Sequence, residues 1–228
     1  KQLFNGAYTR THSYFENSEL AASGLPSAEE LKILEPLRAQ LDPKVFGSVV
    51  EVPQSDASGI IREQQRRAYQ LLKEAGWKIV DDKMVDANGK PVSIEFLLAQ
   101  TDFERVLLPY KRNLADLGIE LVIRRVDVSQ YINRLRSRDF DMIVGGFGQS
   151  SSPGNEQREY WHSASADNPG SRNFIGLKDP AVDSLVEGLI NADSRHSLVA
   201  HTRALDRVLL AGYYGIPNWY IKTWRGAY

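Results

Sequence analysis

The sequence FDMIVGGFGQSSSPG, residues 140–154, joins a short hydrophobic segment to a run of glycine and serine. The segment Phe140–Val144 has the composition of a buried strand, and the small residues after it are typical of a loop. In open α/β folds, ligands bind outside the carboxyl ends of the strands, where such loops expose backbone and hydroxyl groups. The loop contains no strong acid, base, nucleophile or metal ligand. This stretch therefore predicts a place that holds a ligand and does not cleave it.

Alternating strand and helix patterns precede this loop. Hydrophobic strands are expected at residues 92–99 and 119–126, ahead of the one at 140–144. The intervening helices open with cap signals, a capping box at 101–104 and an aspartate cap followed by glutamine at 127–130. Strands that are joined by helices through short links predict parallel pairing with right-handed crossovers.

The remaining segments extend the same α/β pattern. Helices are expected after a capping box at 27–30 and at 61–75, 155–162, 180–190 and 197–212, with a hairpin near Asn88-Gly89 and an aromatic strand at 216–224. The sequence thus predicts an α/β fold with a mixed, mainly parallel sheet flanked by helices. We expect one ligand-binding lobe over residues 1–228, in which residues 1–58 form an irregular, loop-rich opening segment.

The composition is that of an ordinary globular protein. Of the 228 residues, 42% are hydrophobic and 25% are charged, which is enough to build a substantial core. The net charge of −1 gives no broad attraction to nucleic acid, so no nucleic-acid partner is expected. The absence of cysteine excludes disulfides, thiolate metal ligands and cysteine nucleophiles. The chain begins at Lys1 without a signal segment, which leads us to expect an excised domain or a processed product.

No familiar catalytic, cofactor or metal motif is present. Gly145-Gly146-Phe147-Gly148 lacks the GxGxxG spacing of dinucleotide sites, and no Gly-Lys-Ser/Thr follows as in a P-loop. His196 and His201 are five residues apart, off the i,i+4 face that a helical metal pair uses. No Gly-x-Ser-x-Gly elbow activates a serine. We expect no catalytic residue, cofactor or metal, while a serine–histidine–aspartate set built from distant segments remains an open alternative.

Aromatic and basic side chains surround the loop in the sequence. Phe147, Tyr160 and Trp161 bracket the loop and are compatible with a ligand wall, in which Phe147 and Trp161 would stack, although core packing accounts for at least half of such aromatics. Arg158 and Arg172 could each meet a ligand carboxylate with a two-pronged guanidinium fork. On composition alone, a flexible surface loop is an equally good interpretation of the glycine and serine run. Its position after a buried strand favours ligand binding.

Several stretches, taken together and in order, resemble the carboxyl-terminal lobe of bacterial periplasmic oligopeptide-binding proteins, the family 5 solute receptors of ABC importers. The resemblance is greatest to the YejA-like branch. The stretches that carry it are YQLLKEAGW at 69–77, DANGKP at 86–91, VDVSQY at 126–131, DFDMI at 139–143, SSPGNEQ at 151–157, NFIGLKDPAVD at 173–183 and IPNWY at 216–220.

This resemblance implies a periplasmic-binding-protein type II lobe within a two-lobed receptor. Such a receptor closes on an oligopeptide or similar solute and delivers it to an ABC permease of the inner membrane. The resemblance also implies a periplasmic location, a monomer, and a missing amino-terminal lobe of the same chain.

The candidate ligand-binding residues are Gly146, Phe147, Gly148, Gln149, Ser150, Arg158, Trp161, Arg172 and Asn173. The resemblance implies that the segment 146–153 lies in the ligand cleft. Family members often carry an aspartate there, which pairs with the amino group of the peptide. This chain has glutamine and three serines at 149–152 and no carboxylate. An amino terminus is therefore held differently, or the ligand is not an ordinary peptide.

Two other function classes stay open beside the receptor. A hydrolase on the same α/β scaffold is possible because a fold does not fix a function. A buried base beside Ser150, or a metal among the histidines, would support it. A sensing module is the other alternative, and a fused helical or DNA-binding segment would mark that class.

Overall fold

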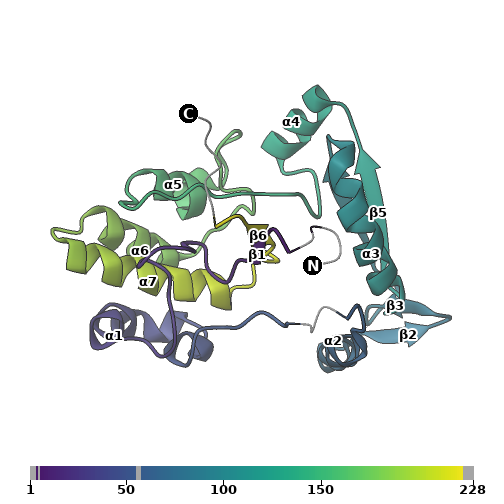
Figure 1. Cartoon of the computed structure of the whole chain (residues 1–228), viewed down its shortest axis with the longest axis horizontal. Helices are drawn as coiled ribbons and strands as arrows, with labels where there is room; N and C mark the ends of the chain where they lie inside the picture. Colours follow the sequence, from purple (N-terminus) through teal and green to yellow (C-terminus); the bar gives the residue numbers. More distant parts are fainter. Residues whose placement is uncertain (1–3, 5, 55–57, 223–228) are drawn as a thin grey trace. The chain divides into compact units, whose positions relative to one another are not determined.

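The computed structural model describes residue 4, residues 6–54 and residues 58–222. The chain divides into two compact units, shown in Figure 1. Unit 1 combines Lys1–Val52 with Gly146–Tyr228, and unit 2 is the intervening Pro53–Gly145. The predicted α/β class is confirmed, and each unit contains helices and small sheets.

Unit 2 is built around a parallel strand pair. Its elements are α2 (Arg62–Glu74), β2 (Lys78–Val80), β3 (Lys83–Val85), β4 (Ser93–Leu98), η3 (Thr101–Phe103), α3 (Glu104–Ala115), β5 (Glu120–Arg125) and α4 (Val128–Ser137). Strands β4 and β5 are parallel and in register from Ser93↔Glu120 to Leu98↔Arg125. Helix α3 lies along this pair, as Figure 1 shows. Their contact forms a core of Phe96, Leu98, Leu107 and Leu121. The predicted parallel crossover is therefore confirmed.

The strand predicted at 140–144 is shorter in the structure than expected. Only Met142 pairs, in a parallel bridge to Phe96, with backbone N–O distances of 2.9 Å from Leu97 and 3.0 Å to Glu95. Val144 is 40% exposed, and the glycines that follow it offer no side chain to bury. Because sheet pairing needs side-chain packing on its neighbours, the chain leaves the sheet after one bridge. The expected mainly parallel sheet is thus a two-stranded pair with one added bridge.

Most local signals were correct. Ser27 completes its capping box at α1 (Ala28–Leu34), and Asp127 caps α4 by accepting from the backbone N–H of Gln130. The capping box expected at 101–104 is wrong, because the chain enters α3 through the 3-10 turn η3, with no side-chain cap. The hairpin expected near Asn88-Gly89 is confirmed, because Val85 bridges Pro91 antiparallel and the N–H of Asp86 donates to the carbonyl oxygen of Lys90 at 3.0 Å. Strands β2 and β3 form a second hairpin, whose turn is Asp81-Asp82, where both residues have positive φ. Such short polar residues tolerate the left-handed region better than most.

Unit 1 is built on a helical hairpin. Its elements are β1 (Thr9–Arg10), α1, η1 (Glu35–Gln40), η2 (Pro43–Phe46), α5 (Glu156–Trp161), η4 (Ser163–Ser165), α6 (Pro180–Ile190), α7 (Arg195–Ala211) and β6 (Trp219–Tyr220). Helices α6 and α7 lie side by side (Figure 1) and bury Leu185, Leu189, Leu205 and Leu209 between them. The strand expected at 216–224 is limited to β6, which pairs antiparallel with β1. Residues 223 and 224 lie outside the described part of the chain.

The opening segment is fixed to α7 by two adjacent charged residues. Arg207 is buried and donates from Nε to Glu30 Oε2 at 2.6 Å, and its remaining nitrogens donate to backbone carbonyls of residues 23, 24 and 47. Asp206 accepts from Ser13 and from the backbone N–H of Tyr14 and Ala22. Residues 1–52 of this segment belong to unit 1. No helix among the described residues is both long and apolar enough to cross a bilayer.

Candidate functional site

The predicted site centres on residues 146–152, which we call the loop. The backbone runs without a turn or bend from residue 143 to residue 150. Gly146, Gly148 and Ser150 are exposed. The structure gives the peptide N–H groups of residues 146–151 no acceptor among the described residues. Unpaired peptide groups of this kind are solvated or available to a partner.

The glycines of the loop are not required by backbone geometry or by packing. Neither Gly146 nor Gly148 has positive φ. A Cβ added at either residue would meet no described atom within 4 Å. A residue with a side chain would therefore fit at both positions. The consequence of glycine here is bare backbone, which another chain or ligand can approach closely.

Arg172 and Tyr160 hold the loop from one side. Arg172 donates from Nη2 to the carbonyl oxygen of Gly146 at 2.9 Å and from Nη1 to the hydroxyl of Tyr160 at 2.9 Å. The Tyr160 hydroxyl in turn donates to the carbonyl oxygen of Gly148 at 3.3 Å. The guanidinium carbon also lies 4.7 Å from the centre of the Tyr160 ring, a favourable cation–π arrangement.

The far end of the loop has a second cationic anchor. Arg195, at the start of α7, donates from Nη1 to the carbonyl oxygen of Ser151 and forms an ion pair with Glu19. Ser150 contributes a local contact, because its hydroxyl oxygen accepts from the backbone N–H of Ser152 at 3.1 Å. The loop is thus anchored at its carbonyl groups from both ends.

Phe147 is the loop side chain that packs against the hydrophobic core of unit 1. Its ring centre lies 4.3 Å from that of Trp161, 5.5 Å from that of Tyr160, 6.0 Å from that of Tyr14 and 6.1 Å from that of Phe174. These distances and tilts are those of favourable aromatic pairs. The aromatic cluster fixes the loop at its centre, and Phe147 itself remains only partly buried.

A chain of amide contacts orients Gln149. The Trp161 Nε1–H, which can only donate, points at Gln157 Oε1 at 3.2 Å. Gln157 must therefore present its Nε2 to Gln149, and it donates to Gln149 Oε1 at 2.7 Å. The Nε2 of Gln149 is buried and has no acceptor among the described residues. A buried donor without a partner is uncommon and costs about 1–3 kcal/mol.

Two predicted site residues are core residues in this structure. Trp161 is 1% exposed, so neither ring face is open to a ligand. Asn173 is 0% exposed, and its amide donates to the carbonyl oxygen of Leu177 at 3.0 Å and accepts from the N–H of the same residue at 2.8 Å. Trp161 supports the loop from behind through Phe147, whereas Asn173 closes the turn before α6.

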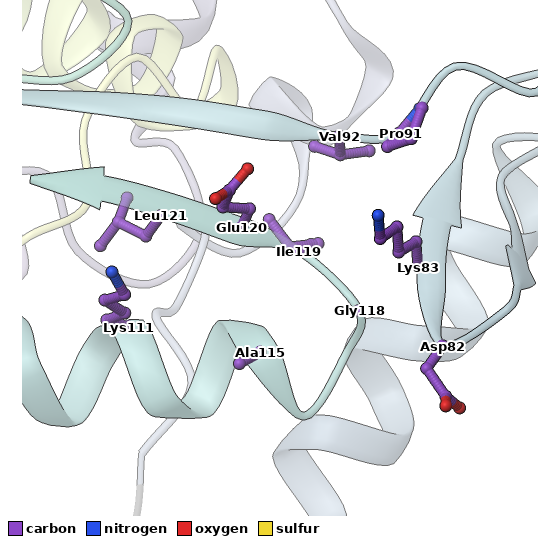
Figure 2. A pocket seen from close by; sticks show the side chains of 10 residues that line it. All are labelled: Asp82, Lys83, Pro91, Val92, Lys111, Ala115, Gly118, Ile119, Glu120 and Leu121. Atoms are coloured by element: carbon purple, nitrogen blue, oxygen red, sulfur yellow. The ribbon is translucent and has the colours of Figure 1, made fainter.

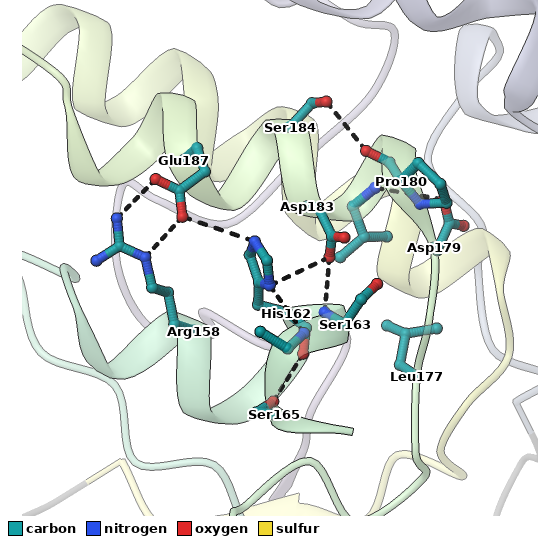
Figure 3. Close-up of polar contacts among 12 residues, drawn as sticks. Arg158, His162, Ser163, Ser165, Leu177, Asp179, Pro180, Asp183, Ser184 and Glu187 are labelled. Atoms are coloured by element: carbon teal, nitrogen blue, oxygen red, sulfur yellow. Dashed lines mark hydrogen bonds and ion pairs between the residues drawn. The ribbon is translucent and has the colours of Figure 1, made fainter. Parts of the chain in front are cut away.

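The guanidinium of Arg158 is engaged within unit 1. It meets Glu187 with two hydrogen bonds of 2.6 Å and donates to Asn155 Oδ1 at 2.7 Å. The hydrogen bonds that Arg158 donates to Glu187 raise the pKa of Arg158 and lower the pKa of Glu187. Figure 3 shows His162 beside the same glutamate, with Nε2 3.7 Å from its Oε1. The carboxylate fork predicted for Arg158 is therefore occupied by a residue of α6.

Sequence reasoning missed the residues that hold the loop from a distance. Tyr14 and Arg195 are far from the loop in the sequence, and no motif marks either of them. Tyr160 and Gln157 precede or adjoin predicted residues, but their hydrogen bonds follow only from the fold. Within the described residues, no group of three or more histidine, aspartate or glutamate side chains could hold a metal ion.

Unit 2 has a hollow of its own, and none of the predicted site residues lines it. It has a volume of about 360 Å³ and is lined by Asp82, Lys83, Pro91, Val92, Lys111, Ala115, Gly118, Ile119, Glu120 and Leu121 (Figure 2). Gly118 shapes its wall, since it has φ +74° and a Cβ there would lie 2.6 Å from the backbone N of Met84. The sequence did not predict this hollow.

Comparisons with known proteins identify relatives over almost the whole chain. The chain is 46% identical over 221 residues to a "Probable peptide-binding protein YejA" from Agrobacterium fabrum, covering 96% of this chain and 36% of that protein. It is 38% identical over 222 residues to the "Peptidoglycan-binding protein YepA" of the same organism, covering 97% and 36% respectively. The chain therefore spans about a third of the length of the curated relatives it matches.

Solved structures of type II periplasmic-binding proteins have the same fold. The oligopeptide-binding protein AppA from Bacillus subtilis, in complex with a nonapeptide, matches 94% of this chain and 46% of its own with a TM-score of 0.63 and 18% identity. A periplasmic oligopeptide-binding protein from Thermotoga maritima with bound mannohexaose matches 96% and 48% with a TM-score of 0.60 and 19% identity. The model of "Bacterial extracellular solute-binding proteins, family 5 Middle" matches residues 1–169. This chain belongs to the bacterial extracellular solute-binding proteins of family 5.

Proposed function

We propose that this chain is the part of an ABC importer's substrate-binding protein that captures oligopeptides or related solutes, and that the loop contacts the ligand. Its role is binding, without catalysis. The ligand contacts proposed are the backbone of Gly146, Gly148 and Ser150, the amide of Gln149 and the partly buried ring of Phe147. Trp161 and Arg172 act behind these groups and keep the loop in place, and Asn173 closes the turn before α6.

The observation that carries this proposal is the set of unpaired peptide N–H groups in the loop. Its peptide N–H groups have no acceptor among the described residues, and its glycines leave room for close approach. An extended peptide can pair with such a segment as an added strand, in which main-chain hydrogen bonds supply affinity with little dependence on side chains. This form of recognition suits a receptor that accepts many sequences.

The relatives support a peptide-type ligand without settling which one. A protein from Agrobacterium fabrum carries the name of a peptide-binding protein, and another carries that of a peptidoglycan-binding protein. A fold relative holds a nonapeptide, and another holds an oligosaccharide. We propose a periplasmic monomer that works with an inner-membrane permease, in which a second lobe completes the ligand enclosure. Ligand pockets bury most of the ligand surface, so we expect this chain alone to bind weakly.

Native mass spectrometry of the whole protein that carries this sequence, purified without denaturation, tests the proposal. A heterogeneous set of short peptide masses, released on denaturation, is the expected result. A single non-peptide mass would retain the receptor and replace the ligand class. Ligand-free protein that gains no mass when about 1 mM of mixed tripeptides is added would overturn peptide capture.

A further inference from the structure

The hydrogen-bonding capacity of the loop is unequal between donors and acceptors. The carbonyl oxygens of Gly146, Gly148 and Ser151 already accept from Arg172, Tyr160 and Arg195. The peptide N–H groups from 146 to 151 have no acceptor in the described part of the chain. The loop therefore offers a ligand more donors than acceptors.

Gln149 adds to this excess through an independent set of contacts. The Trp161 indole can only donate, and it donates to the side-chain oxygen of Gln157. The Nε2 of Gln157 in turn donates to the side-chain oxygen of Gln149, so that oxygen is occupied. The group that remains without a partner is again a donor, Nε2 of Gln149. The loop itself, residues 146–152, carries no carboxylate that could balance these donors.

We propose that the loop takes the acceptor end of its ligand, meaning a carboxylate or successive carbonyl oxygens, and does not hold an ammonium group. This inference rests on the proposed function and adds a ligand polarity to it. An ammonium group has three donors and no acceptor, so it can use none of the free N–H groups of the loop. A carboxylate accepts from several N–H groups, and such charge-assisted hydrogen bonds are about twice as strong as neutral ones.

Arg172 and Tyr160 act as positioning residues in this account. They engage carbonyl groups two residues apart, at Gly146 and Gly148, and so keep those oxygens away from a ligand. The positive guanidinium beside the loop also favours a negative ligand end. Removing either contact frees a loop carbonyl oxygen, which can then accept from a ligand. The loop then prefers the acceptor groups of a ligand over its donor groups less strongly.

Calorimetric titration of the whole protein with three matched probes tests this polarity. The probes are Ala-Ala-Ala, the same peptide acetylated at its amino end, and the same peptide amidated at its carboxyl end. We expect amidation to raise Kd about tenfold or more, because a charge-assisted hydrogen-bond set is lost. We expect acetylation to change Kd by less than about threefold.

Variants assign the effect to the loop. In Arg172→Met and in Tyr160→Phe, the amide-to-acid ratio of Kd should fall toward about threefold or less. Arg38→Met is the matched control, since Arg38 also lies on an aromatic ring, 3.6 Å from the Phe46 centroid, and makes no contact with the loop. Its ratio should equal that of the wild type. Tyr160→Phe removes one oxygen only and keeps the test valid if Arg172→Met does not fold.

Each other outcome overturns the inference. If acetylation weakens binding about tenfold while amidation has no effect, the loop's polarity is the reverse of the one proposed. If the amide-to-acid ratio of Kd is unchanged in folded Tyr160→Phe, the contacts to the loop carbonyls do not determine the preference for a carboxylate. Failure of all three probes to bind at about 1 mM would instead remove the proposed peptide function, and the inference with it.

Discussion

Asp206 is a fully buried carboxylate that joins α7 to the opening segment. It accepts from Ser13 Oγ at 2.6 Å and from the backbone N–H of Tyr14 and Ala22, both at 2.9 Å. Burial raises its pKa to about 6, and the negative charge of Glu16 adds to that effect, although the three hydrogen bonds oppose it. At neutral pH the protein therefore keeps an unfavourable buried charge at this position.

The elevated pKa of Asp206 makes stability depend on pH. Because the folded pKa is above the unfolded value, this group contributes most to stability below about pH 4, and its contribution is lost as the pH rises through 6. We expect the free energy of unfolding of the wild type, relative to Asp206→Asn, to increase by roughly 1.4 kcal/mol between pH 7.5 and pH 5. Urea unfolding of both proteins at the two pH values measures this. A pH-independent difference would show that Asp206 has an ordinary pKa.

Phe147 and Trp161 touch each other but differ in their roles. Trp161 is buried, whereas Phe147 is partly exposed in the loop. Trp161→Ala should lower the free energy of unfolding by about 3–5 kcal/mol, the usual cost of emptying an aromatic core position. Phe147→Ala should cost clearly less in stability and should weaken peptide binding in a protein that remains folded. Equal losses of stability in the two variants, measured by urea unfolding, would mean that Phe147 is only a core residue.

At the scale of elements, the α6–α7 hairpin depends on close approach of two helices. Gly188 lies on α6, and a Cβ there would be 2.5 Å from Cδ2 and 2.7 Å from Nε2 of His201 on α7. The His201 ring cannot turn away freely, because its Nδ1 is 2.9 Å from the carbonyl oxygen of Ser197. Packing against Gly188 thus explains His201, for which the sequence indicated no function.

Gly188→Ala should destabilise unit 1 by about 1–3 kcal/mol through overpacking. His201→Ala provides the space that the new methyl group needs, so the double variant should be less destabilised than the sum of the two single variants. Gly145→Ala is the control, because a Cβ there meets no described atom within 4 Å. Thermal unfolding of the four variants measures these effects. Simple additivity would contradict a steric conflict between Gly188 and His201.

Local signals in the sequence predicted elements better than they predicted pairing. Ser27 and Asp127 were recognisable as caps because each contact spans only a few residues. The strand at 140–144 was overestimated, since its apolar residues match a strand while the exposure of Val144 depends on the whole fold. The cap at Thr101 failed because a 3-10 turn takes its place.

At the scale of the whole molecule, the resemblance correctly indicated the family and the α/β class. What it could not supply was the set of long-range contacts around the loop. Arg172, Tyr160 and Arg195 meet loop carbonyls, and Tyr14 meets Phe147 from the opening segment. These contacts join residues that no periodic pattern connects. The structure therefore adds an account of how the loop is held and which of its groups remain available.

Hydrogen–deuterium exchange of the whole protein, with and without Ala-Ala-Ala, tests most directly whether the loop binds ligand through its backbone. The amides of residues 146–151 have no acceptor among the described residues, so they should exchange rapidly in the free protein. On saturation with the peptide, these amides should become protected, while those in the core of α7 should change little. Binding of the peptide without any added protection at residues 146–151 would contradict the account.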